Sequence, residues 1–311
     1  MVRLDRLMLA AGCSAALGLV AGCATASQHV PSSGRTVAAS LTSTPPHSHR
    51  SPGGTTPARL ATAAADGGPA RLASELSAAE AVLGKGGASP AVTARQALNV
   101  QLVCLRLTER PGWAGMVIER VAPAQRAAAA DDIAGVADLA ALTSPAASLP
   151  RWKIVVPENL AALRADYRAA QAATGVGWQY LAAINFVETN FGRIDGLSST
   201  GAEGPMQFMP ATWAIYGRGD VHRARDAIFA AARFLASSGA PRDIDSAVHA
   251  YNPSWRYVDA VLRYARRLRA DPDALPGYYY RQVTYRLTRG WVLLPSGYGI
   301  HPAARPVPLR T

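Results

Sequence analysis

Apolar residues recur at helical spacing along most of the chain and predict an all-α protein. In the region from 71 to 150, Leu98, Leu102, Leu105 and Ile118 lie in such stretches among many alanines. We expect a helical accessory region there, packed on the segment that follows. Four of its acidic residues are expected at solvated helix positions or at helix caps, namely Glu109, Glu119, Asp131 and Asp132.

The clearest helical pattern lies between residues 151 and 275. One helix is expected to have Pro157 at its first position and to end near Gly175. A second is expected to run from Trp178 to the Asn-Phe-Gly at 190–192. The pattern contains no convincing strand, and its later helices are predicted at Asp226 to Ser238, Ala247 to Tyr251 and Trp255 to Arg269.

The pattern changes after Pro276. Residues 278 to 287 alternate in period two, and the sequence T-R-G-W-V-L-L-P that follows predicts a small hairpin with Gly290 at the turn. Residues 276 to 311 are therefore expected to form a C-terminal tail that contains a β-hairpin.

Residues 1 to 22 have the pattern of an export signal. Arg3 and Arg6 precede an apolar run that is too short and too interrupted by Gly for a good transmembrane span. Val20-Ala21-Gly22-Cys23 resembles a bacterial lipobox, which makes Cys23 the expected lipidated first residue of the mature chain. Cleavage after Ala26 is the alternative. We expect an exported protein of the cell envelope, either lipid-anchored on the outer face of the cytoplasmic membrane or secreted.

Residues 23 to 70 are rich in Ser, Thr, Pro, Gly and Ala and offer little apolar surface, so a disordered tether is expected. His47 and His49 within it are interpreted as solvent-exposed and not as metal ligands. Cys13 lies in the signal, and Cys104 has no partner but the lipidated cysteine. No intramolecular disulfide and no Cys-based metal site are expected.

The net charge is +11, from 32 Lys and Arg against 21 Asp and Glu. A basic surface favours polyanionic partners, either nucleic acid or an anionic cell envelope. The arginines are scattered through helical segments and form no basic tract, which weakens the first possibility. With the export signal, this distribution predicts that the chain has no nucleic-acid partner.

Glu188 is an unusual residue in an apolar run. Leu181 and Ile184 precede it by seven and four residues, so the three share a helix face that packing would bury. A carboxyl group in an apolar setting has a raised pKa and keeps its proton, as a general acid requires. The competing interpretation is a structural Glu, paired with an Arg or with backbone groups, or facing solvent. From helix position alone the structural role is the commoner one.

A loop rich in Gly and Ser follows Glu188, and such a loop allows close approach of the backbone to a ligand. For Phe208 and Trp213, which come after it, a place in the core is the expected role. Gln207 offers a polar anchor. The apolar and aromatic residues suited to the faces of sugar rings are Met206, Phe208, Met209, Trp213 and Tyr216.

These residues together resemble a known signature, E-S-x-F-x(6)-S-x-x-G-A-x-G-x-M-Q-x-M-P-x-T. That is the pattern of the bacterial soluble lytic transglycosylases, which are related to goose-type lysozyme. Ala250-Tyr251-Asn252 resembles their later motif. The resemblance spans roughly 157 to 270 and implies a lysozyme-like α-helical fold for a domain at 151–275. The matching residues are Glu188, Phe191, Ser198, Gly201-Ala202, Gly204, Met206-Gln207, Met209-Pro210 and Thr212.

The resemblance implies that Glu188 is the single catalytic acid/base and cleaves the bond between N-acetylmuramic acid and N-acetylglucosamine in peptidoglycan glycan strands. The muramyl C6 hydroxyl is then the nucleophile, so the second carboxylate of the usual glycosidase pair is not needed. The product ends in a 1,6-anhydro ring. Tyr251 is expected to hydrogen-bond to Glu188. No metal or organic cofactor is implied, and the residues implied to line the saccharide site are Ser198, Met206, Gln207, Tyr251 and Asn252.

Several positions depart from the signature or add acidic candidates. Thr189 replaces the usual Ser, and Pro253-Ser254 replace Ala-Gly. Glu203 stands where the family has a small or apolar residue; it is either a solvated rim residue or a second carboxylate that would permit hydrolysis. Asp195 and Asp220 are interpreted as a turn residue and a helix-entry residue.

Two alternatives stand beside a lytic transglycosylase. One is a muramidase that hydrolyses the same bond with water. The other is a non-catalytic wall-binding protein that retains the fold. The first differs in its product, which is one water heavier than the anhydro fragment. The second is distinguished by behaving in the same way with and without the Glu188 carboxyl group.

Overall fold

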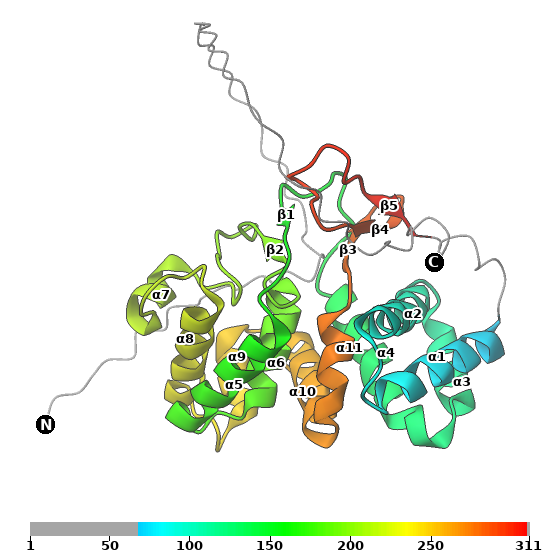
Figure 1. Cartoon of the computed structure of the whole chain (residues 1–311), viewed down its shortest axis with the longest axis horizontal. Helices are drawn as coiled ribbons and strands as arrows, with labels where there is room; N and C mark the ends of the chain where they lie inside the picture. Colours follow the sequence, from blue (N-terminus) through cyan, green and yellow to red (C-terminus); the bar gives the residue numbers. More distant parts are fainter. Residues whose placement is uncertain (1–67, 310–311) are drawn as a thin grey trace, which may run out of the picture.

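The computed structural model describes residues 68 to 309, which form one mostly helical body with a small sheet at one side (Figure 1). The predicted signal peptide, Cys23 and nearly all of the predicted tether lie outside the described residues. Within the described range, no helix is long and apolar enough to span a bilayer.

Four helices form the first part of the body. They bury a core of their own in which Leu72, Leu76, Val100 and Val103 take part. Local sequence explains where the second of them begins, because Ser89 accepts a hydrogen bond from the amide of Val92 and a proline follows at the first helical position. The four helices are α1 (Pro69–Leu83), α2 (Pro90–Glu109), α3 (Ala114–Arg120) and α4 (Arg126–Ala140).

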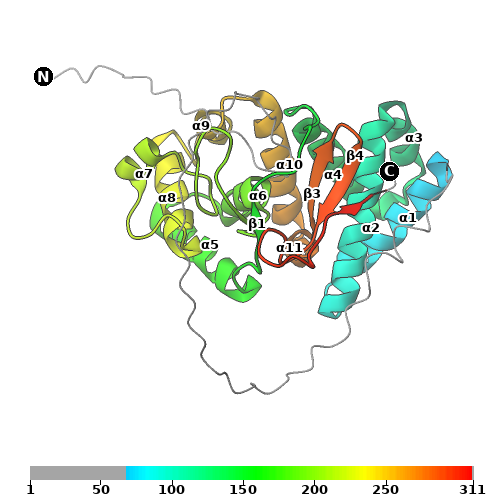
Figure 2. The same ribbon diagram turned by 90° about the horizontal axis from the view of Figure 1, so that it is seen from above.

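Seven further helices form the rest of the helical body, and α6 (Trp178–Thr189) lies between the others (Figures 1 and 2). Every residue of α6 from Leu181 to Thr189 is buried. A helix that is apolar on all sides is a core helix. The other six are α5 (Leu160–Thr174), α7 (Pro210–Tyr216), α8 (Ala224–Ser237), α9 (Ile244–Tyr251), α10 (Trp255–Ala270) and α11 (Leu275–Tyr279).

Two predicted helix starts were wrong, and side-chain capping explains both. Pro157 does not begin α5; the helix begins at Leu160, where the Asn159 side chain accepts from the amide of Ala161 at 2.8 Å. Helix α9 begins three residues earlier than expected, because Asp243 caps it by accepting from the amide of Ser246 at 3.1 Å.

The predicted C-terminal hairpin is present as β3 (Val283–Leu287) and β4 (Gly290–Leu294), with Gly290 at a φ of 113° next to the turn. A third strand, β5 (Val307–Pro308), pairs with β4. The first two residues of the predicted alternating run, Tyr278 and Tyr279, lie in α11, and the strand begins only at Val283.

The first four helices also contribute to the core of the other helices. Helix α4 packs along α10, and Leu105, Leu139 and Ala140 belong to the same buried cluster as the residues of α6. A two-stranded ladder of β1 (Lys153–Ile154) and β2 (Ile194–Asp195), which the sequence pattern did not predict, lies above α6. The all-α class with a small C-terminal hairpin is confirmed.

Candidate active site

Glu188 lies in the last turn of α6 and is completely buried, with 0% of its surface exposed. Leu181 and Ile184 are equally buried on the same side of the helix. The interior position matches the expectation from the apolar face. The helix face that Glu188 shares with these residues does not by itself explain its burial, because α6 is buried on every side.

The hydroxyl of Tyr257 donates a hydrogen bond to Oε1 of Glu188 at 2.6 Å. Tyr257 comes from α10 and is itself fully buried. Tyr251 donates its hydroxyl to the carbonyl of Met206 at 2.5 Å, and its expected hydrogen bond to Glu188 stays a prediction. Helical spacing along α10 predicts an inward-facing Tyr257 but indicates no role for its hydroxyl.

The chain turns sharply directly after Glu188. Asn190 and Phe191 both adopt left-handed backbone conformations, with φ of 52° and 64°. Such conformations are strained for a bulky side chain and persist only when surrounding contacts hold them. The Asn190 side chain donates to the carbonyl of Arg281 at 2.9 Å, and Phe191 is buried against Phe186 and Tyr279.

The hydroxyl of Thr189 connects this turn to the loop that follows. It donates to the carbonyl of Pro205 at 2.6 Å and accepts from the amide of Gly192 at 2.8 Å. Because Ser could make the same two bonds, the departure from the family signature at this position retains its hydrogen-bonding capacity.

Ser198 and Gln207 shape the loop between α6 and α7. The Ser198 hydroxyl accepts from the amides of Thr200 and Ala202 at 3.2 and 2.9 Å. Gln207, at a φ of 49°, donates its side-chain amide to the carbonyl of Gly204 at 3.0 Å. Both side chains are buried, so these hydrogen bonds are shielded from water.

Met206 and Phe208 of this loop belong to the same buried core as Tyr251 of α9. Met206 is fully buried, and its sulfur accepts from the side chain of Asn185 at 3.1 Å. Phe208 lies edge-on to Trp213 and to Tyr251, as expected of a core residue. Asn252, also buried, follows Tyr251 at the end of α9.

The other acidic candidates lie in polar surroundings. Glu203 keeps 28% of its side chain exposed and lies 3.6 Å from the imidazole of His222. Asp195 is exposed at the end of β2. Asp220 accepts from the amide of His222 at 2.9 Å in an exposed loop. Among residues 68–309, no three His, Cys, Asp or Glu side chains lie close enough together to hold a metal ion.

A groove of about 790 Å³ runs beside the same loop. Its walls come from the segment 155–158, from α5, from the residues that follow Glu188 and from the entry to α8. Glu188 itself does not line it. The acidic and basic side chains along it, together with one histidine, are Glu158, Asp166, Asp195, His222, Arg223 and Arg225.

Over 153 residues the chain is 31% identical to a membrane-bound lytic murein transglycosylase F of Thiobacillus denitrificans. The match covers 43% of this chain and 32% of the relative, so the chain spans about a third of the relative's length. No family model matches the chain, and no solved structure matches it. The chain is therefore similar to a lytic transglycosylase, one whose name places it at a membrane.

Proposed function

We propose that the protein is a lytic transglycosylase of the cell envelope, which cleaves peptidoglycan between N-acetylmuramic acid and N-acetylglucosamine. The observation that carries the proposal is a buried carboxyl group, Glu188, held by a tyrosine hydroxyl at the start of the loop that matches the signature. The similarity to a lytic murein transglycosylase supports the same class of reaction.

In the proposed reaction Glu188 starts as the acid. It gives its proton to the glycosidic oxygen as the bond to the muramyl C1 breaks. The resulting carboxylate then accepts the proton of the muramyl C6 hydroxyl, whose oxygen bonds to C1 and closes the 1,6-anhydro ring. Glu188 ends protonated and no water is consumed, so one carboxyl group suffices where hydrolysis needs two.

The surroundings of Glu188 suit this role. Burial in an apolar setting favours the protonated form of a carboxyl group, which is the form that must be present at the first step. Tyr257 fixes one carboxyl oxygen at 2.6 Å, and a held side chain loses less entropy on reaching the reactive geometry. Because Glu188 has no exposed surface, the groups that cover it must separate when a glycan strand binds.

The remaining assignments belong to the same proposal. Ser198, Met206, Gln207, Tyr251 and Asn252 border the saccharide, and their recorded bonds keep the loop in shape around it. Lipid on Cys23 anchors the chain to the membrane through the tether at 23–70. The unit at 71–150 supports a catalytic domain at 151–275 and a tail at 276–311.

The test is digestion of purified peptidoglycan by the full chain and by Glu188→Gln, followed by mass analysis of the sugar ends. Gln has the shape of Glu but cannot donate the proton, so we expect loss of at least about a hundredfold in rate. Products of the parent should be anhydro fragments. Equal activity in the two proteins, or none in either, contradicts an enzyme that uses Glu188.

Glu203→Gln separates the hydrolytic alternative from the proposal. It removes the carboxyl group that could serve as a second acid, which is partly exposed. We expect unchanged product and rate. Fragments one water heavier from the parent, together with loss of activity in this variant, would establish a hydrolase with two carboxyl groups.

A further inference from the structure

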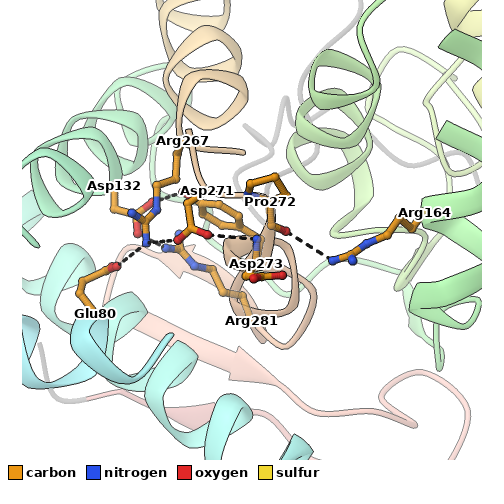
Figure 3. A network of polar contacts seen from close by, with 9 residues as sticks. Glu80, Asp132, Arg164, Arg267, Asp271, Pro272, Asp273 and Arg281 are labelled. Carbon is orange, nitrogen blue, oxygen red and sulfur yellow. Dashed lines mark hydrogen bonds and ion pairs between the residues drawn. The ribbon is translucent and has the colours of Figure 1, made fainter. Parts of the chain in front are cut away.

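A cluster of buried charges joins the first four helices to the rest of the protein (Figure 3). Arg281 donates to Oδ2 of Asp132 at 2.6 Å, and both side chains are about 5% exposed or less. The hydroxyl of Tyr278 donates to the other oxygen, Oδ1, at 2.8 Å. Asp132 was expected to be solvated; it is instead the buried partner of an arginine that lies 149 residues away in the chain.

Arg281 also contacts the end of the helix that carries Glu188. Its carbonyl accepts from the side chain of Asn190, the left-handed residue that closes α6. Its guanidinium group lies 5.6 Å from the ring centre of Phe186, two residues before Glu188. Arg281 therefore contacts α6 on both sides of Glu188, with backbone and with side chain.

A second buried pair ties α10 to the first four helices. Arg267 of α10 donates to Glu80 of α1 at 3.1 Å, and the Glu80 side chain is 2% exposed (Figure 3). Helix α10 carries Tyr257, whose hydroxyl holds Glu188. The turn at Asn190 is thus tied to α4 by the buried ion pair of Arg281 with Asp132. Tyr257 lies on α10, which is tied to α1 by the buried hydrogen bond from Arg267 to Glu80.

We propose that Asp132, through Arg281 and Asn190, is a positioning residue for Glu188, so that α1–α4 are a working part of the active site. The argument rests on the proposed function, since it names what holds the proposed acid in place. Removing one partner of a buried pair leaves an uncompensated charge, so the arginine moves towards water and takes its carbonyl with it. The left-handed turn after Glu188 then loses the bond from Asn190 that helps to hold it.

The experiment compares neighbouring residues of α4 in the full chain, with soluble peptidoglycan strands as substrate. Asp132→Asn removes the buried charge. Asp131→Asn is the matched control, because Asp131 is the neighbouring carboxylate and pairs with Arg266 of α10 at the surface. We expect Asp132→Asn to lower kcat about tenfold or more, with KM within about twofold. Asp131→Asn should leave both values unchanged.

Asn190→Gly tests the route without touching an ion pair. Glycine accepts the φ of 52° at this position, so the turn can form while the bond to Arg281 is lost. We expect a fall in kcat similar to that of Asp132→Asn. The double variant should be little worse than the poorer single variant, because both changes break one connection. A merely structural role would lower the melting temperature and leave kcat of the folded protein intact.

The possible failures are distinguishable. If the wild-type chain and Asp131→Asn release no fragments, the proposed function is wrong and this inference falls with it. If both are active and Asn190→Gly keeps wild-type kcat, the positioning role is wrong and the proposed function stands. The Asn190→Gly variant tests the positioning role even if Asp132→Asn does not fold. If the double variant loses kcat by the product of the two single losses, Asp132 does not act through Asn190.

Discussion

The hydroxyl of Tyr257 is the smallest feature on which the proposed chemistry depends. It is one oxygen atom, 2.6 Å from Oε1 of Glu188, and both residues are fully buried. A hydrogen bond in such surroundings is stronger than the same bond in water, and it fixes the direction in which the carboxyl group points.

We predict that Tyr257→Phe lowers kcat by about tenfold to a hundredfold, which corresponds to the loss of one strong hydrogen bond in the transition state. KM should change little. Tyr264→Phe is the control, because Tyr264 is a buried tyrosine two turns further along the same face of α10. Equal kcat values for the two variants would contradict an orienting role for Tyr257.

At the residue scale the sequence predicted the position of Glu188 better than its partners. A signature matched in order and spacing indicates the acid and the loop, since these are close together in the chain. The prediction of a solvated Asp132 was wrong and the hydroxyl contact of Tyr257 was missed, because these contacts depend on atoms 149 and 69 residues away. Helical periodicity predicts which side of a helix is buried, but not which polar group will meet a buried hydroxyl or carboxylate there.

The loop between α6 and α7 is the element whose shape the site requires. Gly201 and Gly204 both have positive φ, of 88° and 73°. They differ in their surroundings. A Cβ atom on Gly204 would lie 2.1 Å from the carbonyl oxygen of Val221, whereas a Cβ atom on Gly201 would have no neighbouring atom within 4 Å. The loop at Gly204 therefore packs backbone to backbone against the segment that leads to α8.

We predict that Gly204→Ala destabilises the protein by roughly 3 kcal/mol or more and lowers activity, since it adds a steric overlap to an unfavourable backbone conformation. Gly201→Ala should cost only about 1 kcal/mol, the cost of the left-handed conformation alone. Thermal unfolding measures both. Similar melting temperatures for the two variants would mean that the segment at Val221 moves away without cost.

At the element scale the helices were predictable and their first residues were not. Helical spacing of apolar residues predicted the ends of α6 and α10 to within about a residue of those observed. The starts of α5 and α9 were missed because a side-chain cap, from Asn159 or Asp243, prevailed over the proline and apolar signals. The strands β1 and β2 have two residues each, too few for any periodic pattern to appear.

For the whole molecule, the buried charges predict a dependence of stability on pH. Burial, and secondarily the nearby Asp132 carboxylate, raise the pKa of Glu80 from 4.5 to about 8. Between these values the folded protein binds more protons than the unfolded chain. The free energy of unfolding contributed by Glu80 is therefore fully present below pH 4.5 and is lost as the pH rises through 8.

We predict that Glu80→Gln removes this dependence. Relative to wild type, the variant should gain stability between pH 5 and pH 9, by roughly 1 to 4 kcal/mol. Glu75→Gln on the same helix is the control, because Glu75 is about one-third exposed and forms surface pairs. Denaturant unfolding at several pH values gives the comparison, and parallel curves for wild type and Glu80→Gln would contradict the raised pKa.

The great sequence separation of the buried pairs also has a consequence for synthesis. Glu80 meets Arg267 across 187 residues, Gln101 meets Gln282 across 181, and Asp132 meets Arg281 across 149. Domains usually fold in turn as they leave the ribosome, and distant contacts make folding slow. Here the first helices carry carboxylates whose partners are made much later. During synthesis these carboxylates therefore have to stay in water until residues 267–281 have left the ribosome, because burying them unpaired is costly.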